Sequence, residues 1–165
     1  MMQTPRPYAN FAEAFALAYE EELSGESYFA ALSAAESDPR RAALWAKLAL
    51  IERSTHTILR PTAEALGLTP NDPDAVIQSG TDEAARWKSL TWHEIIAEII
   101  RDYPAYVTEF EQLKSLAPAE MKRSAQLLLD HEIAMIDFAR AEQAGDPNPD
   151  AALDAYLAQL PGWTP

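Results

Sequence analysis

The sequence predicts an all-α protein built around four long helices. Glycine is scarce, with 5 among 165 residues, while the strong helix formers Ala and Leu are abundant. Apolar residues recur at helical spacing in four long segments, and turn residues separate those segments. The length suits one domain with a substantial core. We therefore expect a single domain spanning residues 1–165, with the bundle core in residues 10–145.

Turn and capping residues set the boundaries of these helices. Pro39 and Pro118 mark the two short joints, Gly67 and Gly145 are stop signals, and Thr91 is a good N-cap. The predicted helices are, in chain order, residues 10–35, 40–66, 82–89, 91–116, 119–144 and 150–160.

The lengths of the joints predict the connectivity. The first and third joints are tight, so each connects two antiparallel helices. The segment between residues 66 and 91 is long enough to run the full height of a bundle. The second and third long helices then run parallel, which is the connectivity of a ferritin-like four-helix bundle with a long crossover and a short fifth helix at the C-terminal end. A generic up-and-down bundle is the alternative.

Charge and composition exclude several classes of function. The net charge is −13, with 26 Asp and Glu against 13 Lys and Arg, so nucleic acid and anionic membrane surfaces are not expected partners. Cysteine is absent, which excludes disulfides and thiolate chemistry. Residues 1–11 show no signal-peptide pattern, and no apolar stretch is long enough to cross a bilayer. We expect a cytoplasmic protein.

Carboxylates recur on the predicted buried faces at one common height. Glu26 lies 13 residues before Pro39 and Glu52 lies 13 residues after it, so both are roughly 20 Å from that turn at about 1.5 Å per residue. Glu132 lies 14 residues after Pro118, at a similar distance from the opposite end. The three acids are therefore predicted to converge near the middle of the bundle.

The third long helix offers alternative acids. Asp102 is closest in height to Glu132 and borders the apolar stripe, whereas Glu98 and Glu109 are further away in height and point more toward the flank. Height therefore favours Asp102.

Carboxylates in an apolar core need compensation, because desolvation costs several kcal/mol per ion. Two divalent cations would provide it, and an oxygen-rich set suits Mn, Fe, Mg or Ca better than Zn. The competing remedies are protonation of the carboxyl groups and hydrogen bonds or ion pairs with Tyr, Trp, Lys47 or Arg53.

Three short sequence motifs on these helices resemble the rubrerythrin branch of the ferritin-like superfamily. The motifs are Gly25-Glu26-Ser27, Tyr103-Pro104 and His131-Glu132. The resemblance implies two iron ions bound by Glu26, Glu52 and Glu132, with Glu-x-x-His pairs on two of the helices. By resemblance, the position of the Tyr-Pro motif indicates Glu98 as the acid of the third helix, whereas the estimated height along the bundle indicates Asp102. Both remain candidates.

The Glu-x-x-His pairs of that family are degenerate here. Three residues after Glu52 stands Thr55, and the corresponding position of the fourth helix is Met135. His56 follows Glu52 by four residues and still shares a face with it, so His56 is a candidate ligand. Met135 is a poor ligand for hard iron or manganese, so we expect its side chain to pack in the apolar core. His131 is expected to face aside, as a surface or interhelix residue.

Glu22 lies one turn before Glu26, where it is either a further ligand or an acceptor for one. We expect it on the water-filled flank of the bundle.

Two functions follow from this pattern. The first is a di-metal carboxylate oxidoreductase that uses iron or manganese to activate dioxygen or peroxide. The second is a metal-free bundle, equally open, that acts by interaction or by binding a small molecule in a pocket lined by Met135 and Thr55. A homodimer is the expected assembly, with the apolar residues of segment 150–163 covering a neighbouring subunit.

Overall fold

The computed structural model describes residues 5–68 and 72–161, and within these ranges every regular element is a helix. The all-α prediction is therefore confirmed. The elements are α1 (Phe11–Ala35), α2 (Pro39–Ala65), α3 (Pro73–Trp87), α4 (Trp92–Asp102), α5 (Pro104–Leu116), the 3-10 turn η1 (Ala119–Met121), α6 (Lys122–Ala144) and α7 (Ala151–Gln159).

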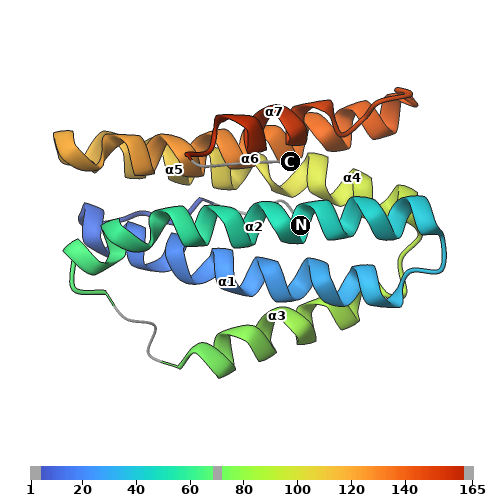
Figure 1. The fold of residues 1–165 in the computed structure, drawn as a ribbon, viewed down its shortest axis with the longest axis horizontal. Helices are drawn as coiled ribbons and strands as arrows, with labels where there is room; N and C mark the ends of the chain where they lie inside the picture. The colour runs from blue at the N-terminus through green and yellow to red at the C-terminus, as the bar shows by residue number, and fades with distance from the viewer. Residues whose placement is uncertain (1–4, 69–71, 162–165) are drawn as a thin grey trace.

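Figure 1 shows how these helices are arranged. The long helices α1 and α2 lie side by side and antiparallel, and α3 leads the chain back along α1. Helices α4 and α5 follow one another in the direction of α2, and α6 runs antiparallel to them. Helix α7 packs on α6 and α2. No helix within the described ranges has both the length and the apolar character that a membrane crossing requires.

Local sequence signals explain where the helices begin and end. The side chain of Asn10 accepts a hydrogen bond from the Glu13 backbone N–H and starts α1. Thr91 and Glu94 form a reciprocal capping box at the start of α4. Gly145 ends α6 with φ of 72°, a left-handed conformation that glycine adopts without strain.

The crossover is a packed helix rather than a largely irregular segment. The sequence predicted a short helix over residues 82–89, but α3 begins nine residues earlier, at Pro73. Gly80 allows α3 to approach α1 closely, because a Cβ at this position would lie 2.1 Å from the backbone oxygen of Ser24. Gly80 lies outside the helix predicted over residues 82–89, but in the structure it packs α3 against α1.

The predicted third long helix is divided in two. Helix α4 ends at Asp102 and α5 begins at Pro104, whose ring nitrogen carries no N–H to continue the hydrogen-bond ladder. The chain keeps its direction, because the backbone N–H of Tyr103 still donates to Ile99 at 3.1 Å.

The apolar core consists of two clusters separated by a polar layer. Glu22 on α1, Glu52 on α2 and Glu132 on α6 each lie between the parts of their helix that contribute to the two clusters. One cluster includes Phe29, Trp45, Ile96 and Phe138, and the other includes Phe15, Leu59, Phe110 and Leu128. The acidic residues therefore lie at the middle of the fold, between two apolar halves.

Helix α7 completes the core of its own chain, whereas the sequence predicted that its apolar residues cover a neighbouring subunit. Leu153, Tyr156, Leu157 and Leu160 are all buried in one of the two clusters. The Tyr156 hydroxyl lies 2.6 Å from the Thr55 hydroxyl, which ties α7 to α2. Trp163, the last apolar residue of the predicted contact, lies outside the described residues.

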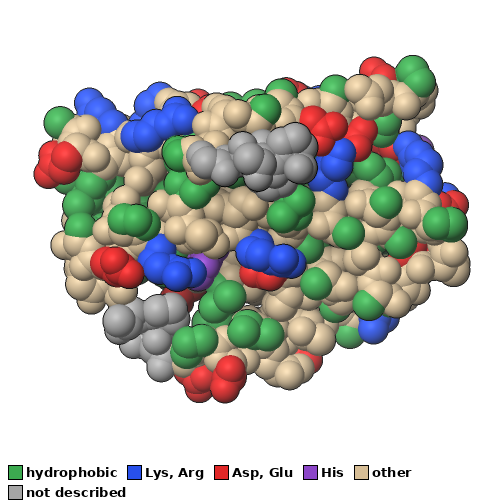
Figure 2. Space-filling model, viewed as in Figure 1, with side chains coloured by type: hydrophobic (Ala, Val, Ile, Leu, Met, Phe, Trp, Pro, Cys, Tyr) green, Lys and Arg blue, Asp and Glu red, His purple; other side chains and the backbone are tan. Residues whose placement is uncertain are grey.

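Ion pairs cover much of the surface around this core. On the face drawn in Figure 2, basic side chains lie beside acidic ones at several points. Lys47 on α2, for example, contacts Asp150 and Asp154 next to α7. These local pairs distribute the few cations of an acidic chain among its many carboxylates.

Candidate metal centre

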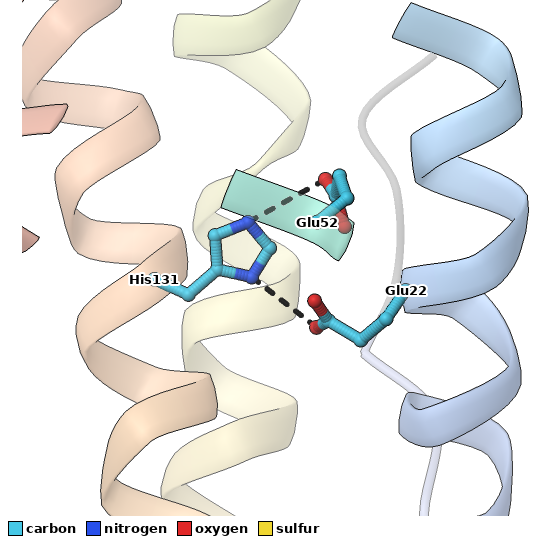
Figure 3. A group of neighbouring side chains, drawn as sticks. All are labelled: Glu22, Glu52 and His131. Atoms are coloured by element: carbon cyan, nitrogen blue, oxygen red, sulfur yellow. Dashed lines mark hydrogen bonds and ion pairs between the residues drawn. The ribbon is translucent and has the colours of Figure 1, made fainter. Parts of the chain in front are cut away.

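Two carboxylates and one imidazole from three different helices meet in the polar layer. Figure 3 shows Glu22 of α1, Glu52 of α2 and His131 of α6 pointing toward one another. One ligand atom from each residue lies within 4.8 Å of the others. All three residues are buried, with exposed fractions of 2%, 6% and 1%. A group of this composition, size and burial could bind a metal ion.

The imidazole of His131 lies between the two carboxylates. Its Nδ1 is 3.2 Å from Oε1 of Glu22, within hydrogen-bonding distance. Its Nε2 is 3.4 Å from Oε1 of Glu52, but among the described residues this nitrogen has no hydrogen-bond partner. If the proton is on Nδ1, the lone pair of Nε2 faces the Glu52 carboxylate, and a cation or a second proton is needed between them.

A glycine makes room for one of the carboxylates. A Cβ on Gly25 would lie 2.6 Å from Cδ of Glu52 and 2.7 Å from its Oε2. Any larger residue at position 25 would displace the Glu52 carboxylate from its position beside His131. A glycine inside a helix costs about 1 kcal/mol relative to alanine. At position 25 this cost leaves the space that the Glu52 carboxylate occupies.

Burial and neighbouring charges shift the pKa values of this group strongly. Desolvation raises the pKa of Glu52 well above its usual 4.5, and this effect outweighs the opposing effect of His131. Burial alone would lower the pKa of His131, but the charges of Glu22 and Glu52 raise it well above 6.5. Glu52 and His131 therefore both bind protons more tightly in the folded chain than in the unfolded chain.

Glu132 lies next to this group along α6. It is 8% exposed, and burial raises its pKa from 4.5 to about 8. A carboxyl group with this pKa is mostly protonated at neutral pH. Glu132 can therefore hold and release a proton beside the group.

A cavity of about 240 Å³ opens onto the group. Glu22, Glu52, His131 and Glu132 all line it. Within the described part of the chain, Oε2 of Glu22 and Oε2 of Glu132 are buried without a hydrogen-bond partner, as is Nε2 of His131. Buried polar atoms without partners are rare in folded proteins, so atoms of this kind around one cavity indicate a ligand.

The structure places the predicted ligands of the first two helices differently. Glu52 belongs to the group. Glu26 does not, because its Oε1 accepts a hydrogen bond from Nε of Arg53 at 2.7 Å, with its side chain 28% exposed. His56 stacks on Tyr19 with ring centroids 4.3 Å apart, and it is not part of the group.

The two predicted acids of the third helix lie at the rim of the cavity. Glu98 and Asp102 both line it, but they pair with Arg101 at 3.6 Å and 2.7 Å and are only partly buried. Neither joins the buried group. The fully buried acid of the predicted third helix is a third residue.

That residue is Glu109 of α5, whose side chain is completely buried. It binds Arg6, which donates from its backbone N–H at 2.9 Å and from Nη2 at 2.7 Å. The Tyr8 hydroxyl donates to the same carboxylate at 2.6 Å. The buried glutamates of the described chain are thus Glu22, Glu52, Glu109 and Glu132, from α1, α2, α5 and α6.

The sequence analysis expected Glu22 on the flank of the bundle and His131 facing aside, although a signal for a buried His131 was available. Leu128, Met135 and Phe138, at positions −3, +4 and +7 from His131, are all buried. This spacing places His131 on the apolar face of α6. Glu22 shares a face with Glu26, one helical turn away, so only the height within the bundle distinguishes them.

Comparisons of this chain with protein-family models, with curated proteins and with solved structures found no match. The group of Glu22, Glu52 and His131 is therefore the observation from which a function must be argued.

Proposed function

We propose that this protein is a ferritin-like metalloprotein that binds one Fe²⁺ or Mn²⁺ ion through Glu22, Glu52 and His131. The observation that carries the proposal is the convergence of these three buried side chains from three helices within 4.8 Å. Two carboxylate oxygens and one imidazole nitrogen suit the divalent ions of iron and manganese.

Charge supports this assignment. Two ionised carboxylates buried without a cation would cost several kcal/mol each, and one divalent ion balances both. The Nε2 atom of His131 has no hydrogen-bond partner among the described residues, and it becomes a neutral ligand when the metal displaces the proton of the ring. The single ion would thus satisfy the unpartnered atoms of Glu22 and His131.

We propose one ion rather than two, because Arg6 already pairs with a carboxylate that a second ion would need. A second ion would need further carboxylates, and Glu109 is the remaining fully buried acid. Its carboxylate accepts hydrogen bonds from Arg6 and Tyr8 and is therefore already neutralised by a guanidinium. Glu132 lies outside the three-ligand group and serves as a proton carrier in this proposal.

The ferritin-like assignment is supported by the path of the chain. Helix α2 and the α4–α5 pair run in the same direction, and α3 forms the crossover between them. The four buried glutamates come one each from the four bundle segments. This combination is the pattern that the superfamily uses to place acids in a bundle core.

Glu22, Glu52 and His131 would hold the ion, and the cavity that they line would admit a small molecule. When bound, Fe²⁺ or Mn²⁺ supplies redox or Lewis-acid chemistry to a small molecule such as dioxygen or peroxide. In the metal-free protein Glu132 holds a proton beside the group at neutral pH, because burial raises its pKa to about 8. Apolar clusters flank the layer on both sides.

Metal analysis tests this proposal. The chain, purified without chelator, is loaded anaerobically with Fe²⁺ or Mn²⁺, desalted and analysed for bound metal. We expect about one ion per chain, and loss of that ion in Glu52→Gln and in His131→Ala. Glu64→Gln, at an exposed position of the same helix as Glu52, is the matched control and should keep the ion. Equal metal content in all four proteins contradicts the proposal.

A further inference from the structure

Two of the residues that line the cavity, both outside the proposed metal group, carry a buried hydrogen-bond donor. These donors are the Tyr28 hydroxyl and the Trp87 indole N–H, and neither has a hydrogen-bond partner among the described residues. Tyr28 is 7% exposed and Trp87 is 6% exposed. Each such group costs about 1–3 kcal/mol if it stays unsatisfied, so a ligand that satisfies both would be stabilised.

The two donors share one wall of the cavity. Tyr28 comes from α1 and Trp87 from the end of α3, and their rings pack edge to face with centroids 5.2 Å apart. The indole N–H can only donate. The pKa of Tyr28 is raised strongly by burial, so its hydroxyl keeps its proton. This wall therefore requires a ligand atom that accepts hydrogen bonds, such as an oxygen.

The size and walls of the cavity suit a single aromatic ring. Its volume of about 240 Å³ exceeds the roughly 150 Å³ of an engineered cavity that binds benzene in another protein. Aromatic and other apolar side chains form much of the remaining wall, namely Phe29, Tyr103, Tyr106, Phe110 and Met135. Rings of this kind pack favourably against one another in offset or edge-to-face geometry.

Charge at the cavity favours a neutral ligand. The acids at its rim are paired, Glu83 with Arg86, and Glu98 and Asp102 with Arg101. At its floor the buried glutamates oppose an anion. An uncharged molecule avoids this penalty.

We propose that this cavity binds a neutral single-ring aromatic molecule whose oxygen atom accepts hydrogen bonds from Tyr28 and Trp87. The inference goes beyond the metal site and does not depend on it, because neither donor belongs to the metal group. If both proposals hold, the same cavity brings an aromatic molecule next to the ion.

Acetophenone, a neutral aromatic ketone, is the probe. It is titrated into ¹⁵N-labelled, chelator-treated protein while the indole N–H signals of the 4 tryptophans are followed by NMR. Trp87→Phe assigns the relevant signal by removing it. We expect a saturable shift of the Trp87 signal. Because the protein is metal-free, the outcome is separate from the test of the metal site.

Variants and matched probes decide the chemistry. Tyr28→Phe should weaken acetophenone binding roughly 3- to 10-fold, the value of one hydrogen bond, while Tyr19→Phe should leave it unchanged because Tyr19 does not line the cavity. Circular dichroism verifies that both variants are folded. Ethylbenzene, benzoate and benzylamine should all bind more weakly than acetophenone. The proposal is overturned if the Trp87 signal does not move, if any of these three binds as tightly, or if Tyr28→Phe has no effect.

Discussion

Replacing Glu132 with glutamine should stabilise the metal-free protein, and the gain should grow with pH. The carboxyl group is buried at the polar layer, and burial raises its pKa from 4.5 to about 8. Below about pH 4.5 the group is protonated in both the folded and the unfolded chain, so it has no effect on stability. Between these two pKa values the unfolded chain releases the proton while the folded chain retains it, so the free energy of unfolding falls as pH rises.

The size of the effect follows from those two values. Each pKa unit corresponds to about 1.36 kcal/mol, so at pH 7 the carboxyl costs roughly 3 kcal/mol, and above about pH 8 it costs roughly 5 kcal/mol. Glutamine has nearly the same shape and no charge to bury. For a chain of this length, 3 kcal/mol corresponds to a rise of roughly 6–12 °C in melting temperature.

Urea unfolding between about pH 5 and about pH 8, in the presence of a chelator, measures this difference. The free energies of unfolding of the wild type and of Glu132→Gln should nearly coincide at the acidic end and separate progressively toward the alkaline end. Glu64→Gln, at an exposed position, should follow the wild type throughout. A gap that does not change with pH, or a Glu132→Gln protein less stable than the wild type at pH 8, refutes the reasoning.

Three further outcomes are expected. Because the pKa values of Glu52 and His131 are raised, metal binding should displace protons and its affinity should rise with pH; calorimetry in buffers of different ionisation enthalpy counts those protons, and a buffer-independent heat contradicts it. Gly25→Ala should lower metal affinity roughly 10- to 100-fold by displacing the Glu52 carboxylate, with little change in the urea midpoint, and unchanged affinity would exclude the steric argument. Arg6→Ala should destabilise the fold by up to about 3 kcal/mol by leaving Glu109 buried and unpaired, and adding Glu109→Gln should recover part of that loss; no recovery in urea unfolding would show that the charge is not the cause.

The helices could be predicted because their signals are local. The capping residues Asn10 and Thr91 and the stop residue Gly145 act within a few positions of themselves, and the helices begin or end beside them. The crossover helix was not predicted in full, and most of its residues are exposed. Its position depends instead on the contact of Gly80 with α1, which joins residues distant in sequence.

The candidate site was predicted in kind but not in every residue. Counting residues from Pro39 and Pro118 placed the acids near the middle of the bundle. An error of one residue, however, rotates a helical position by about 100°, and an error of one turn changes its height by about 5.4 Å. Such errors separate Glu26 from Glu22 and Glu132 from His131. Glu109 depends on Arg6, which lies 103 positions away in the sequence and cannot be paired with it from one sequence alone.

Crystals grown with Mn²⁺, with diffraction data collected on both sides of the manganese absorption edge, test the metal site most directly. The account predicts one anomalous peak in the polar layer, with carboxylate oxygens of Glu22 and Glu52 and a nitrogen of His131 each at about 2.0–2.3 Å. An empty layer, or a peak bound only by exposed carboxylates elsewhere on the surface, would contradict it.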